Sequence, residues 1–242
     1  MRILSFGGGV QTVALLLLEV QGEAARADHV VFADTGGEIP ETYSYMEAFV
    51  KPFCRRHALP FHVVRAGGHY GPSLYDYYWR YRVIPQPYSR SCTRKFKIGP
   101  IYRFLRQHGA SAKEPTEIQV GISADEAHRR RETGRLYARN AYPLCNVELG
   151  RTDCARVITE AGWPVPPRSA CYFCPFQRLS RWRETQKRHP ELIEKAIALE
   201  DRARERAEFY ITGRKPLRAL LEGEQRDLPG LEGTCGLGYC FV

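Results

Sequence analysis

Four short runs of apolar and β-branched residues recur in the first half of the chain, separated by segments long enough for helices. The runs are Arg2–Phe6, His29–Ala33, Phe61–Arg65 and Glu117–Gly121. The helical segments are Thr12–Ala24, Pro40–His57 and Lys97–His108. Short strands that alternate with helices are typical of a parallel sheet covered on both faces. The sequence therefore predicts an α/β fold, in which ligands bind beyond the carboxyl ends of the strands.

Three consecutive glycines, Gly7, Gly8 and Gly9, directly follow the first of these runs. The next segment, Thr12–Val20, has the residue types of a helix. Glycines let the backbone approach a ligand closely, and a helix N-terminus offers unpaired N–H groups. The turn is therefore suited to hold a phosphate. An ordinary glycine-rich turn between a strand and a helix is the alternative.

The bulk composition indicates a globular chain with a polyanionic partner. The 242 residues are 43% hydrophobic and 26% charged, enough for one domain with a large core. No apolar run approaches the length of a membrane helix, and we expect a cytoplasmic protein without a leader. The formal charge of +9 favours nucleic acid or a phosphate-rich small molecule. Arginines and lysines cluster in 90–97, 129–135 and 178–188, although each cluster is equally consistent with a solvated surface.

Acidic residues follow two of the predicted strands. Asp34 stands at the tip of one strand, before a Thr-Gly-Gly turn, and could bind a ribose hydroxyl or Mg²⁺. Capping of the next helix is the alternative for Asp34. Glu126 and Arg129 follow another strand, where an arginine is suited to bidentate contact with phosphate and surface charge pairing is the alternative.

Eight cysteines, in a reducing compartment, are more consistent with thiols or metal ligands than with disulfides. Cys171 and Cys174 form a C-x₂-C pair, a spacing that lets two thiolates hold one metal or cluster, either zinc or iron–sulfur. Cys54 lies in a helical pattern and is interpreted as a buried thiol. Further candidate ligands are Cys92, Cys145, Cys154, Cys235 and Cys240.

The pattern changes near Tyr142, which divides the chain into an α/β core, 1–141, and a cysteine-containing extension, 142–242, that packs on the core as one domain. Within the core, residues 67–87 form an excursion rich in Gly, Tyr and Pro. Its aromatic side chains suit either a base-stacking surface or a packed aromatic cap over the sheet.

Together these segments resemble the phosphoadenosine phosphosulfate (PAPS) reductase family, within the adenine nucleotide alpha-hydrolase-like, or PP-loop ATP pyrophosphatase, superfamily. The phosphate loop of the family, SxSGGKDS, aligns with residues 5–12, and its motif DTG-x-x-[FL]-PET with residues 34–42. A third motif, G-[IQ]-R-x-x-E-[SA]-x-x-R, is matched at Gly121, Glu126 and Arg129. Residues 92–100 are similar to CCxxRKVxP of cluster-containing reductases, and residues 235–237 to their C-terminal ECGLH.

The resemblance implies a three-layer, Rossmann-like (HUP-type) fold that binds ATP, PAPS or adenylyl sulfate, with Mg²⁺. The implied nucleotide-binding residues are Ser5, Gly7, Gly8, Gly9, Gln11, Thr12, Asp34, Thr35, Gly36 and Gly121. Asp34, Glu126, Arg129 and Cys235 are the implied catalytic residues, with Asp34 near the ribose or Mg²⁺.

A [4Fe-4S] cluster is implied on Cys92, Cys171 and Cys174, with zinc as the alternative metal. Cys154 is favoured as the fourth ligand because it lies near the C-x₂-C pair. Cys235, Cys145 or an open iron that binds sulfide are the alternatives. Cys235, on a glycine-rich tail, is better suited to act as a nucleophile.

The chain departs from the reductase pattern in several places. Val10 and Gln11 replace the lysine and aspartate of the phosphate loop, and Thr93 and Phe96 replace a cysteine and an arginine. In the tail, Thr234 and Gly238 replace a glutamate and a histidine. These departures resemble a broader branch that is related to the ATP-using component of DNA phosphorothioation.

Three functions are consistent with these patterns. The first is an ATP pyrophosphatase that adenylylates a DNA, tRNA or small-molecule acceptor and assists sulfur transfer from cluster-bound sulfide or a persulfide, with a cysteine desulfurase as a possible donor. The second is a sulfonucleotide reductase, in which Cys235 attacks the substrate and thioredoxin releases sulfite. The third is a nucleic-acid-binding module with a structural zinc.

Overall fold

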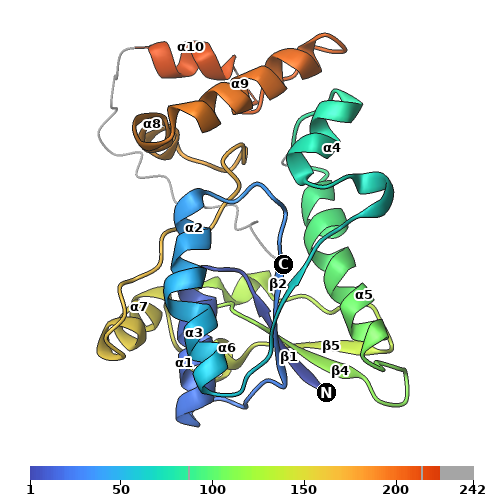
Figure 1. Cartoon of the computed structure of the whole chain (residues 1–242), viewed down its shortest axis with the longest axis vertical. Coiled ribbons are helices and arrows are strands. Elements are labelled where there is room, and N and C mark those ends of the chain that lie inside the picture. Colours follow the sequence, from blue (N-terminus) through green and yellow to red (C-terminus); the bar gives the residue numbers. More distant parts are fainter. Residues whose placement is uncertain (87, 214, 224–242) are drawn as a thin grey trace.

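The computed structural model describes residues 1–86, 88–213 and 215–223. Its centre is a five-stranded parallel sheet with the strand order β3-β2-β1-β4-β5 (Figure 1). The strands are β1 (Arg2–Phe6), β2 (His29–Ala33), β3 (Phe61–Val64), β4 (Thr116–Val120) and β5 (Ala138–Ala141). The predicted α/β fold is confirmed, and β5 is an additional strand at the edge next to β4.

The sheet is covered on both faces. Successive side chains of a strand point to opposite faces, and in these strands both sets are apolar. Leu4 and Phe32 pack into one cluster together with helices α1 (Val10–Gln21) and α7 (Arg151–Glu160). Their neighbours Ile3 and Val31 pack on the opposite face, against α5 (Gly99–Gln107). Helices α3 (Lys51–Arg56) and α6 (Pro143–Asn146) also belong to the first face. The result is the three-layer arrangement.

Two of the predicted helices contain a wide, π-type turn. The helical run from Pro40 is α2 (Pro40–Tyr45), η1 (Met46–Val50) and α3. The run that ends in α5 begins with η3 (Thr93–Ile98). Each wide turn precedes a proline, Pro52 or Pro100, whose missing N–H interrupts the regular hydrogen-bond ladder.

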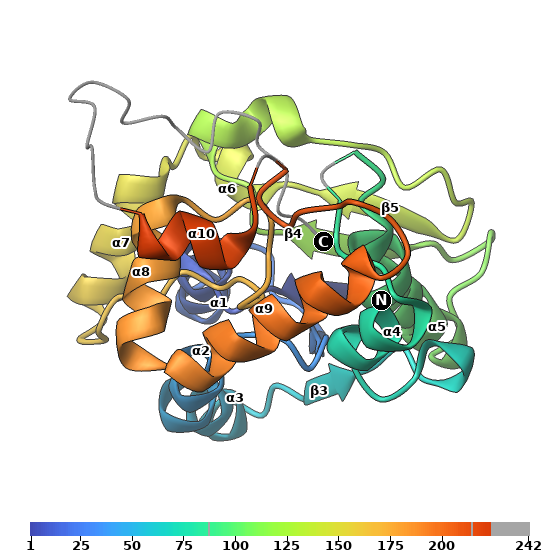
Figure 2. The same ribbon diagram turned by 90° about the horizontal axis from the view of Figure 1, so that it is seen from above.

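A third apolar cluster lies beyond the carboxyl end of the sheet. It joins α4 (Leu74–Tyr81) to α8 (Leu179–Arg188), α9 (Pro190–Arg204) and α10 (Leu217–Glu222). Figure 2, viewed from above, shows α8, α9 and α10 lying over the rest of the molecule. Leu74 and Tyr78 are buried in this cluster, so these two residues of the aromatic excursion are a packed cap against α9. Trp79 and Tyr81 stay partly exposed. None of the described helices is long and apolar enough to cross a membrane.

Glu19, in α1, gives a prediction about pH and stability. Its carboxylate is 2% exposed and accepts the Ala27 N–H at 3.0 Å. Burial raises the pKa of Glu19 to about 8, although the Ala27 N–H and the charges of Arg2 and Arg26 oppose this. The folded state therefore binds more protons than the unfolded state between the ordinary value of 4.5 and about 8. We expect the free energy of unfolding to fall as pH rises through this range, by up to about 1.4 kcal/mol per pH unit.

Urea unfolding at pH 6 and pH 9 tests this prediction. In the Glu19→Gln variant the decrease in unfolding free energy should be much smaller, because the amide oxygen still accepts the Ala27 N–H and carries no charge. Glu23→Gln, at a nearby exposed position, is the matched control and should follow the wild type. An equal decrease in Glu19→Gln and wild type would contradict the prediction.

Candidate functional site

The strand order predicts a ligand site at the carboxyl edge of the sheet, between β1 and β4. The chain runs from β1 to β2 and β3 on one side and returns to β4 and β5 on the other. In open parallel sheets, ligands bind at the carboxyl end of such a reversal point. The Gly7–Gly9 loop leaves β1 here and Gly121 leaves β4. A Cβ on Gly121 would lie 2.6 Å from Thr12 Cγ2 and 3.0 Å from the Thr12 nitrogen, so the two loops are in close contact.

The glycine loop leaves the N-terminus of α1 without a side-chain cap. Gly8 has a φ of +72°, and a Cβ there would lie 2.9 Å from Thr42 Cγ2. Gly9 is the N-cap, with no capping side chain and no acid in the first helical turn. Among the described atoms, the buried Ser5 hydroxyl has no hydrogen-bond partner. An uncapped N-terminus beside an unpartnered hydroxyl suits an anion.

Gln11 connects this loop to two other segments. Its Nε2 donates to Glu126 Oε2 at 3.2 Å, and its Oε1 accepts from Arg151 Nη1 at 3.2 Å. Glu126 also pairs with Arg129, both within η4 (Ala124–Arg129). The residue that replaces the family's aspartate therefore holds a glutamate and an arginine at the glycine loop. The sequence patterns missed Arg151, which begins α7 and reaches the loop because α7 packs on α1.

Asp34 directly follows β2, and both oxygens of its carboxylate accept hydrogen bonds. Oδ1 accepts the Gly36 N–H at 2.8 Å and the Tyr43 hydroxyl at 2.7 Å, while Oδ2 accepts Nε and Nη2 of Arg65 at 2.9 and 2.6 Å. Burial raises the pKa of Asp34, but these hydrogen bonds outweigh it and hold the pKa below its ordinary value. Ile39, rather than Asp34, is the N-cap residue of α2. Asp34 instead fixes the turn that contains Thr35 and Gly36.

The C-x₂-C loop lies directly against this turn. Tyr172 donates its N–H to the Gly37 carbonyl at 2.9 Å, and Cys171 forms an isolated antiparallel bridge with Glu38. The Thr35 hydroxyl lies 3.4 Å from Cys171 Sγ. The segment after β2 therefore positions the cysteine loop at the carboxyl edge of the sheet.

Ser169 links the cysteine loop to the glycine loop. Its hydroxyl lies 2.6 Å from the Gly7 carbonyl oxygen and 3.2 Å from Glu38 Oε2, and donates to one of them at a time. Glu38 is buried and also accepts from Lys97 Nζ at 3.4 Å. No sequence pattern pointed to Ser169. Through Ser169 and Glu38, three of the segments that carry the family resemblance, 5–12, 34–42 and 92–100, form one connected site.

Cys92, Cys171 and Cys174 line one cavity of about 70 Å³. Burial raises the pKa of the Cys171 thiol, and the nearby Glu38 adds to this. The described lining holds no histidine and no carboxylate, so its donors are those that iron–sulfur clusters and zinc prefer. Within the described residues, no three His, Cys, Asp or Glu side chains are grouped so as to hold a single metal ion.

The other candidate cysteines lie elsewhere. The structure does not bring Cys154 to this cavity: it is fully buried in α7, on the face that packs against α1. The expectation that Cys154 joins the other three thiols therefore fails, because the helical face of a residue, and not its distance along the chain, decides its neighbours. Cys145 donates to the Ile122 carbonyl at 3.2 Å. Cys54 is 1% exposed. Cys235 and Cys240 lie outside the described residues.

Comparison with known proteins identifies the family. A model of the phosphoadenosine phosphosulfate reductase domain matches residues 2–161, and the chain belongs to this family. No curated protein matches the chain. Among solved structures, the U34-tRNA thiolase NcsA from Methanococcus maripaludis, with its [4Fe-4S] cluster, is similar over 92% of this chain and 80% of its own. Its sequence identity is 14% and its TM-score is 0.38.

Proposed function

We propose that this chain is an ATP pyrophosphatase that cleaves ATP to AMP and pyrophosphate and supports sulfur transfer to an acceptor, with a nucleic acid as the favoured acceptor. The observation that carries the proposal is the Ser169 link, which places a thiol-lined cavity beside a glycine loop suited to phosphate. Family membership supports an adenine nucleotide as the ligand of that loop.

The triphosphate of ATP would lie at the start of α1. The glycine loop lacks the lysine of the family pattern, since Val10 stands there and is buried. Arg151 supplies a cation instead: its guanidinium is held by Gln11 and, in the described chain, pairs with no carboxylate. Mg²⁺ would bind the phosphate oxygens, as is usual for nucleotide triphosphates. Glu126 and Arg129 complete the polar edge of the site.

The proposed reaction has two chemical steps. An acceptor oxygen attacks the α-phosphorus of ATP and displaces pyrophosphate, which turns the oxygen into part of a good leaving group. Hydrosulfide then displaces AMP from the acceptor carbon, so that one oxygen is replaced by one sulfur without a change of oxidation state. The cations around the glycine loop stabilise the charge that develops on pyrophosphate.

The thiols of the cysteine cavity are donors of the kind that hold a [4Fe-4S] cluster, and Cys92, Cys171 and Cys174 would be its ligands. With three protein ligands, such a cluster would supply an iron that is open to sulfur. The protein's own contribution is to hold the Cys171 thiol against the Thr35 hydroxyl and to shield all three thiols partly from solvent. Cys235 lies outside the described residues, and no step of the proposed reaction is assigned to it.

Arg151→Ala tests the proposed phosphate cation. We expect ATP affinity to fall about tenfold, the equivalent of about 1.4 kcal/mol, because a charged hydrogen bond to phosphate is lost. Isothermal titration calorimetry with ATP and Mg²⁺ measures this. Arg156→Ala is the matched control on the same helix, because Arg156 pairs with Asp153. Equal affinities of the Arg151 and Arg156 variants would contradict the assignment.

The reaction itself is tested with anaerobically purified protein and ATP labelled at the α-phosphate. The proposal expects labelled AMP. Labelled ADP, or sulfite release from PAPS without any ATP cleavage, would assign the chain to a different reaction.

A further inference from the structure

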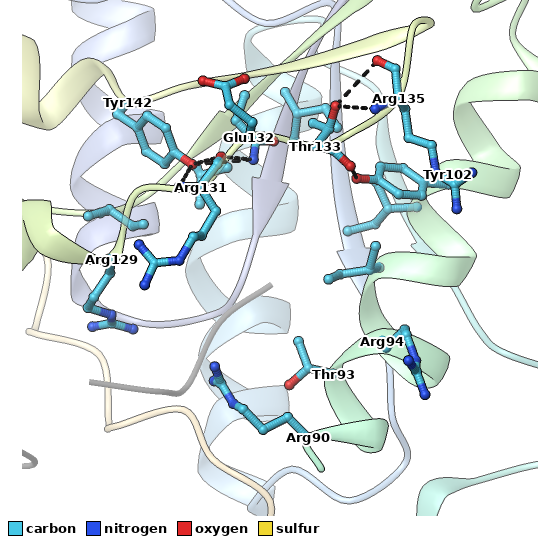
Figure 3. Close-up of a pocket in the computed structure, with 16 residues that line it drawn as sticks. Arg90, Thr93, Arg94, Tyr102, Arg129, Arg131, Glu132, Thr133, Arg135 and Tyr142 are labelled. Carbon is cyan, nitrogen blue, oxygen red and sulfur yellow. Dashed lines mark hydrogen bonds between the residues drawn. The ribbon is translucent and has the colours of Figure 1, made fainter. Parts of the chain in front are cut away.

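A second cavity, of about 380 Å³, opens at the carboxyl end of β4 (Figure 3). One of its walls is η3 with the start of α5. The opposite wall is the segment from Arg129 to Tyr142, and Val120 and Ile122 lie between the walls. A cavity of this size is in the range of sites that hold a small ligand.

The cavity carries a large excess of positive charge. Its described lining contains five arginines and one carboxylate, Glu132. The arginines come from both walls: Arg90, Arg94, Arg129, Arg131 and Arg135. In Figure 3, Arg129 and Arg131 extend toward the side of Arg90 and Thr93. Several guanidinium groups in one cavity suit the oxygens of phosphate groups.

Part of this charge has no internal partner. Within the described chain, Arg94, Arg131 and Arg135 form no ion pair. Arg131 donates to the carbonyl groups of His128 and Arg130, at 2.9 and 2.8 Å, and Arg135 lies 5.8 Å from the centre of the Tyr102 ring. Arg139 differs from these three arginines. It is adjacent in sequence to Asn140 of the cavity lining, but it lies outside the cavity and pairs with Glu117. The charge in the cavity is therefore available to an external anion.

The rest of the lining is apolar and aromatic. Ile118, Val120 and Ile122 form the floor between the two walls, and Tyr102 and Tyr142 stand on opposite walls. Such a floor can bury the face of a nucleobase while the arginines hold its phosphates. Arg94 and Arg135 are exposed, so the cations continue outward past the cavity. This favours a chain of phosphates over a single nucleotide.

The two cavities share a wall. Arg90 and Thr93 line the arginine cavity and also the cavity of the three thiols. Cys92 lies between them in the sequence. A group that is bound to the arginines is therefore adjacent to the proposed source of sulfur.

We propose that the arginine cavity is the acceptor subsite and binds single-stranded nucleic acid through its phosphodiester backbone, with one nucleotide inserted between the two walls. Its role as acceptor subsite rests on the proposed sulfur transfer, whereas binding of the nucleic acid does not. The triphosphate of ATP is held at the start of α1, and Arg129 is the one arginine of the described cavity lining that also belongs to the edge of the ATP site.

Fluorescence anisotropy with a labelled 12-nucleotide single strand, as DNA and as RNA, tests the proposal. The double variant Arg94→Ala/Arg135→Ala removes one arginine from each wall. We expect at least about tenfold weaker binding of the strand, because two charged contacts to phosphate are lost. The slope of log affinity against log salt should decrease by about 1.4, or about 0.7 for each lost phosphate contact. ATP affinity should stay within twofold of wild type. Arg139→Ala, whose arginine lies outside the cavity, is the matched control and should bind the strand like wild type.

Each of the following results would overturn the proposal: no binding of either strand to the wild type at 50 mM salt, unchanged strand binding in the double variant, or a loss of ATP affinity that matches the loss of strand affinity. The last result would make the cavity part of the ATP site. In the wild-type protein, ATP and the strand should bind together, and competition between them would also overturn the proposal. A failure to form AMP from ATP would count against the proposed function alone, since this test measures binding.

Discussion

Gly121→Ala is expected to abolish high-affinity ATP binding. The new Cβ would lie 2.6 Å from Thr12 Cγ2, 3.0 Å from the Thr12 nitrogen and 3.2 Å from the Gln11 carbonyl carbon. Two of these atoms are backbone, so the start of α1 must move away from β4, and the phosphate site moves with it. We expect ATP affinity to fall by at least about tenfold, and the unfolding free energy by about 1–3 kcal/mol from overpacking. Calorimetric titration and urea unfolding measure the two effects.

Gly109→Ala separates loss of the site from loss of stability. Gly109 has a φ of +86°, but a Cβ there would meet nothing within 4 Å. We expect this variant to lose about 1 kcal/mol of stability and to bind ATP like wild type. If Gly121→Ala kept wild-type ATP affinity, the crevice between β1 and β4 would not be the nucleotide site.

Cys171→Ser is expected to remove the proposed iron–sulfur cluster and the proposed sulfur transfer while ATP binding persists. Cys171 is held by Thr35 in the cavity that it shares with Cys92 and Cys174. Serine is a poor ligand for the iron of a cluster, so the iron content of anaerobically purified protein should fall to background. ATP affinity should stay within about threefold (about 0.7 kcal/mol) of wild type, because the start of α1 is unchanged.

Cys154→Ala is the matched control for that experiment. Cys154 is buried between α7 and α1, so this variant should keep its iron and lose only packing energy. Iron and acid-labile sulfide assays on both variants give the answer. Loss of iron in Cys154→Ala, or its retention in Cys171→Ser, would contradict the assignment of the ligands.

The sequence predicted the sheet wherever strands were apolar. Runs such as Ile3–Phe6 and Val30–Ala33 are buried on both faces and are recognisable for that reason. Strand β5 was missed because Ala-Arg-Asn-Ala has no apolar run. β5 lies at the edge of the sheet and pairs with β4 alone, so its side chains are less buried than those of the central strands.

The candidate site was predictable where it follows the strands. Loops that leave neighbouring parallel strands meet at one edge, so the glycine loop, Asp34 and Gly121 could be expected to lie together. Ser169 and Arg151 could not, because they reach Gly7 and Gln11 across 162 and 140 residues of sequence. Those contacts depend on how the extension folds back over the core. Cys154 was mispredicted because its nearness to the C-x₂-C pair in the sequence did not show which face of α7 it lies on.

The central claim is that ATP cleavage at the glycine loop and sulfur chemistry at the cysteine cavity belong to one reaction. The most direct test is to incubate anaerobically reconstituted protein with ATP, Mg²⁺, ³⁵S-labelled sulfide and single-stranded nucleic acid, and to quantify nucleotide products and labelled strand together. Our account predicts AMP and pyrophosphate in equal amounts, with one sulfur atom incorporated for each AMP. ADP and orthophosphate as products, or AMP formed without any incorporated sulfur, would contradict it.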